Sequence, residues 1–283
     1  MSSKSKTTSR RKVTTKRRAS SPQPVAGIQR TMPAWQRYLL SFLLILCFSA
    51  GFYWFFIRPY AYRWKPCYGL KGYGVCMPCD FDVHGIDISH HQGEIDWEQL
   101  STDKNLKFPI HFIFMKATEG GDFVDNTFTY NFEQTRTHGF IRGAYHYFTP
   151  QTDPLKQAEH FISNVTLQAG DLPPVLDVEV KGRKTPEELK TAVRTWLQRV
   201  EQHYGIKPIL YTSYKFKERY LNDSIFNTYP YWIAHYYVDS VRYQGKWHFW
   251  QHTDVGTVPG IDEKIDLNVF NGSLEELTSL TLK

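Results

Sequence analysis

From residue 82 onward, short apolar segments alternate with longer segments in which apolar residues recur every three or four positions. The apolar segments predict eight strands, at residues 83–89, 110–117, 141–148, 174–180, 208–212, 231–236, 247–252 and 264–269. The longer segments predict helices at residues 95–100, 126–138, 154–167 and 185–204. Strands and helices therefore alternate at first, and the last three strands are joined mostly by loops. This order predicts an α/β barrel that is regular in its first part and irregular in its last.

Polar side chains stand at the ends of nearly all these strands. They are Asp87, Glu119, His146, Tyr147, Asp177, Glu179, Tyr211, Gln251, Asp266 and Asn268. Any one of them could be a satisfied polar group of the core, but α/β barrels keep their chemistry at the carboxyl ends of their strands. The whole set therefore predicts a polar site at one rim of the barrel.

Residues 174–180 (PVLDVEV) carry two carboxylates at the end of an apolar run. Asp177 and Glu179 are two positions apart, which puts both side chains on one face of a strand. A solvated strand end, or an ion pair with a nearby lysine, would leave the same pattern. The neighbouring motifs decide between these readings.

A run of twenty residues without a charge, residues 38–57, precedes the barrel, and ten Lys or Arg but no Asp or Glu precede that run. Its length matches one crossing of a bilayer, and the basic excess predicts a cytoplasmic N-terminus. We therefore expect a disordered basic tail at residues 1–37, a transmembrane helix at 38–57, a stalk at 58–80 and a barrel at 81–283 in the periplasm or outside the cell. A cleaved signal peptide is the main alternative, because small residues occur at 49–51.

The charge distribution limits the expected partners. The chain has 34 Lys and Arg against 28 Asp and Glu, but ten of the cations lie in the tail, so the remainder is net acidic. The tail is expected to contact anionic lipid headgroups. We expect no nucleic acid binding, since no basic patch interleaved with aromatic residues is present. An acidic domain suits a transition state that gathers positive charge.

Three of the four cysteines lie close together beyond the apolar run. Cys67, Cys76 and Cys79 predict one disulfide and a spare thiol, with the pairing left open, whereas Cys47 lies in the run itself. The Cys76–Cys79 spacing also occurs in redox and zinc pairs. No second pair of this kind follows, so a structural disulfide in the stalk is favoured.

Several motifs resemble those of glycoside hydrolase family 25, in order, over about residues 81–271. They are GIDISHHQG at 85–93, IDW at 95–97, FMKATEG at 114–120, YHY at 145–147, DVE at 177–179, WIA at 232–234, WQ at 250–251 and DLN at 266–268. The resemblance implies a flattened, TIM-like (β/α)5(β)3 barrel. It also implies a lysozyme, an N,O-acetylmuramidase that cleaves the β-1,4 bond between N-acetylmuramic acid and N-acetylglucosamine in peptidoglycan.

Glycosidic cleavage needs an acid for the leaving oxygen and an anionic group for the oxocarbenium-like carbon. Glu179 is predicted to be the acid/base, with its pKa raised by an aromatic cleft and by Asp177. Asp177 is predicted to orient the substrate's own 2-acetamido oxygen as nucleophile. Asp87 and Asp266 are then electrostatic and positioning groups, although Asp87 as the direct nucleophile stays open. Either route retains the anomeric configuration.

Substrate contacts are expected from Glu119, His146, Tyr147, Tyr211, Trp232, Trp250, Gln251 and Asn268. Of these, the aromatic residues could stack on the apolar faces of sugars, although Tyr and Trp are more often core residues. His90, His91 and His146 are clustered but lack the carboxylate spacing of a metal site. We therefore predict neither a metal nor a cofactor.

Two other functions fit parts of the pattern. A chitinase-like glycosidase also uses an Asp-x-Glu strand, but its motif needs a further Asp where this chain has Val175. A catalytically silent, membrane-tethered peptidoglycan-binding module needs no acids, yet every expected acid is present. The sequence does not determine the oligomeric state.

Overall fold

The structure of the chain is a computed structural model that describes residues 32–58, 67, 69–103 and 107–283. Most of the predicted basic tail, up to residue 31, lies outside the described residues, as do residues 59–66 and 68 of the predicted stalk. Two compact units divide the chain, Met1–Tyr60 and Ala61–Lys283. Each unit is described by itself.

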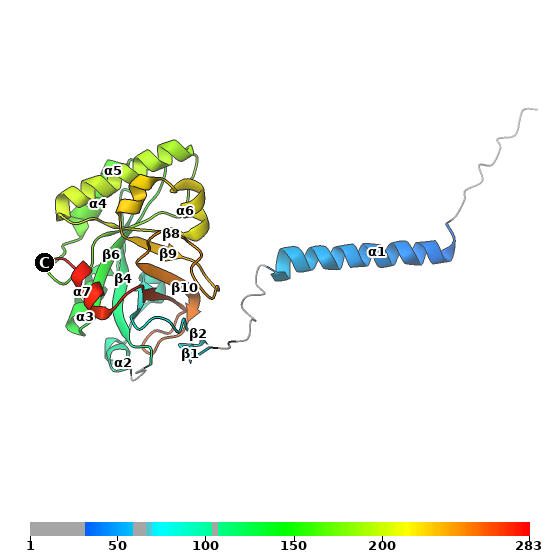
Figure 1. Cartoon of the computed structure of the whole chain (residues 1–283), viewed down its shortest axis with the longest axis horizontal. Coiled ribbons are helices and arrows are strands. Elements are labelled where there is room, and N and C mark those ends of the chain that lie inside the picture. Colours follow the sequence, from blue (N-terminus) through cyan, green and yellow to red (C-terminus); the bar gives the residue numbers. More distant parts are fainter. Residues whose placement is uncertain (1–31, 59–66, 68, 104–106) are drawn as a thin grey trace, which may run out of the picture. The chain divides into compact units, whose positions relative to one another are not determined.

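The first unit contains one long apolar helix (Figure 1). Helix α1 spans Ala34–Phe52 and continues through a π-helical segment, Tyr53–Ile57. Together they form 24 residues, the most apolar 18-residue window has a mean hydropathy of 2.1, and no residue of this stretch is buried. At 1.5 Å per residue the helix is about 36 Å long, which is enough to cross the apolar core of a bilayer. A membrane anchor and a signal sequence share these properties.

The second unit is a closed barrel of eight strands, all of which the hydrophobic pattern predicts. They are β3 (His84–Ile88), β4 (Ile110–Glu119), β6 (Ile141–Tyr147), β7 (Val175–Asp177), β8 (Ile209–Ser213), β9 (Tyr231–Ala234), β10 (Phe249–Gly256) and β11 (Ile265–Phe270). Strand β3 pairs with both β4 and β11, which closes the ring. Neighbours from β3 round to β10 are parallel, whereas β11 is antiparallel to β10 and β3. Two-residue strand β5 (Phe123–Val124) extends the sheet beside β4.

A helix follows each of the first five barrel strands, so the (β/α)5(β)3 order is confirmed. These helices are α2 (Trp97–Ser101), α3 (Phe128–Thr137), α4 (Pro154–Asn164), α5 (Pro186–Tyr204) and α6 (Tyr214–Tyr220); α7 (Leu274–Leu280) comes after the last strand. Figure 1 shows α4 and α5 next to each other on the outside of the barrel. The remaining strands β9, β10 and β11 are joined without α-helices.

Local sequence explains why α5 begins and ends where it does. Thr185 and Glu188 form a capping box, with Pro186 at the first helical position. Gly205 ends the helix in the left-handed conformation at φ 70°, which glycine adopts without steric cost. The helix buries one face, made of Leu189, Ala192, Val193, Trp196, Leu197 and Val200. Burial of this apolar face holds α5 against the barrel.

Alternation along the strands separates an inner core from an outer one. Phe112 and Phe114 of β4 pack with Trp232 and Phe249, and the Phe114 and Trp232 rings are 4.4 Å apart. The intervening Ile113 and Met115 instead belong to the core shared with the helices. Successive side chains of a strand point to opposite faces of the sheet, so the inner set fills the barrel.

A hairpin of β1 (Lys71–Gly72) and β2 (Val75–Cys76) precedes the barrel. A disulfide joins Cys67 to Cys76, and Cys79 is a free, exposed thiol. The prediction of one disulfide and a spare thiol is therefore confirmed. Cys47, in the apolar helix, is also free.

Candidate active site

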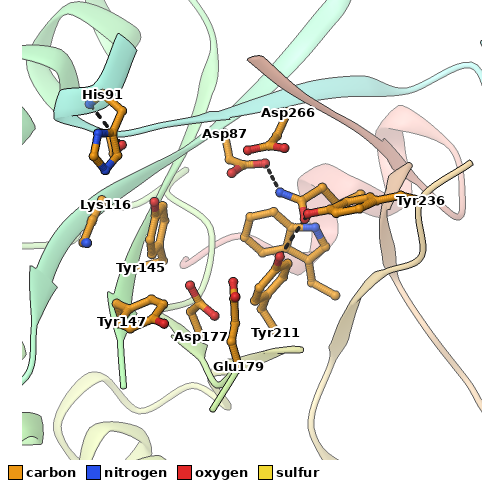
Figure 2. A pocket seen from close by; sticks show the side chains of 13 residues that line it. Asp87, His91, Lys116, Tyr145, Tyr147, Asp177, Glu179, Tyr211, Tyr236 and Asp266 are labelled. Atoms are coloured by element: carbon orange, nitrogen blue, oxygen red, sulfur yellow. Dashed lines mark hydrogen bonds between the residues drawn. The ribbon is translucent and has the colours of Figure 1, made fainter. Parts of the chain in front are cut away.

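A cavity of about 220 Å³ opens at one rim of the barrel (Figure 2). It is lined by Asp87, Ser89, His91, Lys116, Tyr145, Tyr147, Asp177, Glu179, Tyr211, Trp232, Tyr236, Gln251 and Asp266. Four of these side chains are carboxylic acids, and five are aromatic. The four acids that were predicted to be catalytic therefore meet in one cavity.

Asp177 and Glu179 lie side by side in this cavity, and Figure 2 shows both carboxyl groups turned toward its interior. The predicted strand extended to residue 180, but β7 ends at Asp177. Beyond that end, the Val178 N–H still donates to the Tyr211 carbonyl oxygen at 3.0 Å. This bond keeps the chain beside β8, so Glu179 stays next to Asp177 although it lies outside the strand.

The two carboxyl groups differ in their surroundings. Asp177 is buried, and its Oδ1 has no hydrogen-bond partner among the described residues. Burial raises the pKa of Asp177 well above its usual value, and the nearby charge of Glu179 adds to the shift. Glu179 is more open to solvent, at the mouth of the cavity. Desolvation by the cavity wall raises its pKa as well, although hydrogen bonds with Tyr211 and Asp177 oppose the shift.

Asp87 and Asp266 face each other directly across the β3–β11 pair. Burial raises the pKa of both carboxyl groups, and the charge of Asp87 raises the pKa of Asp266 further. The sequence analysis placed Asp266 at the end of the last strand, but it is the second residue of β11. It still reaches the same rim, because β11 runs antiparallel to its neighbours.

Amide groups hold one oxygen of Asp87. Its Oδ2 accepts hydrogen bonds from Gln251 Nε2 at 2.8 Å and from Asn268 Nδ2 at 2.7 Å. The hydroxyl groups of Tyr211 and Tyr236 donate to Gln251 Oε1 at 2.6 and 2.7 Å. Gln251 and Asn268 were predicted to bind substrate, yet their amide groups are occupied by other side chains of the protein.

His146 and Trp250 do not reach the cavity, so their predicted substrate contacts are not supported. His146 is fully buried outside the barrel, with Thr118 Oγ1 2.8 Å and Gln157 Oε1 3.2 Å from its ring nitrogens. The Trp250 indole donates to the His235 carbonyl oxygen at 2.8 Å. Both residues sit next to an inward-facing residue in a strand, and alternation therefore turns them outward.

Glu119 also lies outside the cavity lining. Its carboxylate forms an ion pair with Lys116 at 2.5 Å. Lys116 itself lines the cavity, and its ammonium group is 5.1 Å from the centre of the Tyr147 ring. Glu119 therefore reaches the site only through Lys116.

Five lining residues were not selected by the sequence analysis: Ser89, His91, Lys116, Tyr145 and Tyr236. Alternation could have found three of them. Lys116 is two positions after inward-facing Phe114, and Tyr145 is two positions before Tyr147. Tyr236 is four positions after inward-facing Trp232 within the predicted strand 231–236, although β9 itself ends at Ala234.

Only two of the three clustered histidines stay together: the rings of His90 and His91 are 4.0 Å apart, whereas His146 is buried elsewhere. His91 lines the cavity, and His90 contacts Asp125 at 2.7 Å. Among the residues that the structure describes, no group of three or more His, Cys, Asp or Glu has the arrangement of a metal site.

Comparisons with a family profile, with protein sequences and with solved structures all lead to the same family. The family profile "Glycosyl hydrolases family 25" matches residues 86–261. The chain is 41% identical over 223 residues to the uncharacterized protein YegX of Escherichia coli (strain K12). The alignment covers 78% of this chain and 80% of that protein. It is 32% identical over 213 residues to Lysozyme M1 of Streptomyces globisporus, and the alignment covers 70% of this chain and 71% of that lysozyme.

The solved structure of a family 25 glycosyl hydrolase from Bacillus anthracis has the same fold. It matches with a TM-score of 0.65 and 32% sequence identity. The match covers 72% of this chain and 95% of that chain.

Proposed function

This chain belongs to glycosyl hydrolase family 25, and from that premise we propose that it is an N-acetylmuramidase of the lysozyme type. Its substrate is peptidoglycan, and it cleaves the β-1,4 bond between N-acetylmuramic acid and N-acetylglucosamine. The similarity to Lysozyme M1 supports this proposal. The observation that carries it is the Asp177–Glu179 pair, two carboxyl groups with raised pKa values in one aromatic-lined cavity.

Glu179 is the proposed acid/base. Its side chain stands at the solvent-open mouth of the cavity, where a polysaccharide can reach it. Its raised pKa keeps the proton available nearer to neutral pH, which suits a general acid for the leaving oxygen. After departure of the leaving group, the same carboxylate accepts a proton from water.

Asp177 is proposed to stabilise an oxazolinium intermediate formed by the substrate's 2-acetamido oxygen. The unpartnered Oδ1 supports this role, because the acetamido N–H needs an acceptor at the reacting end of the cavity. Asp87 supplies negative charge behind the anomeric carbon, and Asp266 beside it is a positioning group. Direct attack by Asp87 is the alternative, and both routes retain the configuration.

Aromatic side chains provide the proposed sugar contacts. Tyr147 and Tyr236 are partly exposed in the cavity, whereas Tyr211 and Trp232 are almost fully buried. The first two can therefore present their rings to the apolar face of a sugar. The second two contribute mainly to the shape of the cavity floor.

The rest of the chain is proposed to place this domain at the cell wall. Residues 38–57 are proposed to anchor the protein, with the basic tail at 1–37 in the cytoplasm and in contact with anionic lipids. Residues 58–80 form the stalk, and residues 81–283 form the hydrolase in the periplasm or outside the cell. The apolar helix and the basic residues before it support this arrangement.

Digestion of purified peptidoglycan tests the function. The full-length protein in detergent micelles is incubated with peptidoglycan, and the released fragments are analysed by mass spectrometry after borohydride reduction. We expect reduced N-acetylmuramic acid at the new ends. Reduced N-acetylglucosamine would contradict the muramidase assignment, and binding without any release would identify a silent peptidoglycan-binding module.

A further inference from the structure

Asn268 lies between Trp232 and Asp87 in the floor of the barrel. The Trp232 indole N–H donates to Asn268 Oδ1 at 2.8 Å, and Asn268 Nδ2 donates to Asp87 Oδ2 at 2.7 Å. Trp232 is 2% exposed, Asn268 0% and Asp87 8%. The three groups therefore form a chain of hydrogen bonds that is nearly closed to solvent.

The indole group fixes the direction of this chain. An indole N–H can only donate, so the end of Asn268 that faces it must be the oxygen. The amino group of Asn268 must then face Asp87. Inversion of the amide would place two donors together at one end and two oxygens together at the other, and each contact would be lost.

Gln251 differs from Asn268 in this respect. Its Oε1 accepts from two hydroxyl groups, those of Tyr211 and Tyr236, and a hydroxyl group can either donate or accept. The Gln251 amide can therefore invert when Asp87 takes up a proton. Only the bond from Asn268 is independent of the protonation state of Asp87.

We propose that Trp232 and Asn268 are positioning residues that hold Asp87 with Oδ2 as a permanent hydrogen-bond acceptor. Oδ1 is thereby left as the oxygen that meets the substrate. The kinetic consequences of this inference rest on the proposed muramidase function. Neither residue needs to contact the reacting atoms for this role.

The arrangement also decides where negative charge resides between Asp87 and Asp266. Hydrogen bonds from Asn268 and Gln251 favour the ionised form of Asp87, against the effect of burial. Burial and the charge of Asp87 both raise the pKa of Asp266. The chain from Trp232 therefore keeps the charge on Asp87 and the proton on Asp266. The other titratable groups that line this cavity are His91, Lys116, Tyr145, Tyr147, Asp177, Glu179, Tyr211 and Tyr236.

Titration of Asp87 tests the inference without any substrate. The full-length protein, labelled with ¹³C at the Asp carboxyl groups, is titrated in detergent micelles, and the Asp87 signal is assigned by its loss in Asp87→Asn. Trp232→Phe keeps a ring but removes the indole N–H, and Asn268→Asp keeps the acceptor for Trp232 but removes the donor. We expect both variants to raise the midpoint of Asp87 by about 1 pH unit, a tenfold change in proton affinity.

The control is Trp247→Phe, which makes the same substitution at a partly buried ring packed on Phe81 and outside the cavity. It should leave the Asp87 midpoint unchanged. If Asn268→Asp fails to fold, Trp232→Phe decides alone, since it is the milder change. A midpoint within 0.3 unit of wild type in every folded variant would overturn the inference, whether or not the protein cleaves peptidoglycan.

Kinetics separates positioning from direct substrate contact. Trp232→Phe should lower kcat about tenfold with KM nearly unchanged, and should shift the acid limb of the kcat profile to higher pH. In the Asp87→Asn background the same substitution should have less than a twofold effect, because the group through which it acts is gone. An equal loss in both backgrounds would assign Trp232 to substrate binding and reject the positioning role.

Discussion

Replacement of Glu179 by Gln removes a transferable proton from the cavity with little change in side-chain size. General acid–base catalysis contributes about 10²–10⁴-fold to a rate. The structure favours the upper part of this range, because Asp87 and Asp177 are less than 9% exposed and lie deeper than Glu179. We therefore expect kcat to fall about 10³–10⁴-fold, equivalent to about 4–5.5 kcal/mol of transition-state stabilisation.

The assay is release of new reducing ends from purified peptidoglycan by the full-length protein in detergent. Pelleting with insoluble peptidoglycan should show that Glu179→Gln still binds, and its thermal midpoint should not fall. The matched control is Glu133→Gln on α3, whose side chain is 71% exposed and does not line the cavity. Its kcat should equal that of the wild type. If Glu179→Gln keeps more than a tenth of wild-type activity, the general acid is another group.

Further predictions concern stability, stereochemistry and topology. Asp177→Asn should lose most activity yet raise the thermal midpoint at pH 8. Because the folded-state pKa of Asp177 is raised, its contribution to folding stability is present below the unfolded pKa and is lost as pH rises through the folded pKa. The increase in the thermal midpoint should therefore vanish toward pH 4. An equal gain at both pH values would contradict this. Asp171→Asn removes the carboxylate that holds buried Arg142 at 2.7 and 3.1 Å, and should cost about 3–5 kcal/mol in denaturant unfolding; a cost below 1 kcal/mol would refute it. NMR of the first product, before mutarotation, should show the β-anomer, and an initial α-anomer would reject both proposed nucleophiles. Protease outside intact spheroplasts should digest the barrel; digestion of the basic tail alone would reverse the proposed topology.

The order of the barrel elements could be predicted because each strand and helix carries its own hydrophobic period. The helix predicted at 185–204 spans Pro186–Tyr204, and its cap and terminal glycine are local features. The end of β7 was less predictable. Its pairing with β8 stops where Asp177 meets Tyr211, and this depends on the neighbouring strand rather than on residues 174–180 themselves.

Alternation along the strands could have predicted more of the site than the sequence analysis did. Adjacent residues of a strand face opposite sides, so His146 and Tyr147 could not both enter the cavity, nor could Trp250 and Gln251. Strict use of this alternation would have removed His146 and Trp250 from the predicted contacts. It would also have added Lys116.

The sequence alone determined the order of strands and helices and the acids that meet at one rim, because strand periodicity and short motifs are local properties. Only the tertiary structure decided which groups hold Asp87. The bond from Asn268 joins residues 181 positions apart and exists only because β11 closes the ring against β3. Tyr236 likewise reaches Gln251 from a neighbouring segment, two residues beyond the end of β9. Such contacts depend on how distant segments meet in space, and no local pattern of residues encodes that meeting.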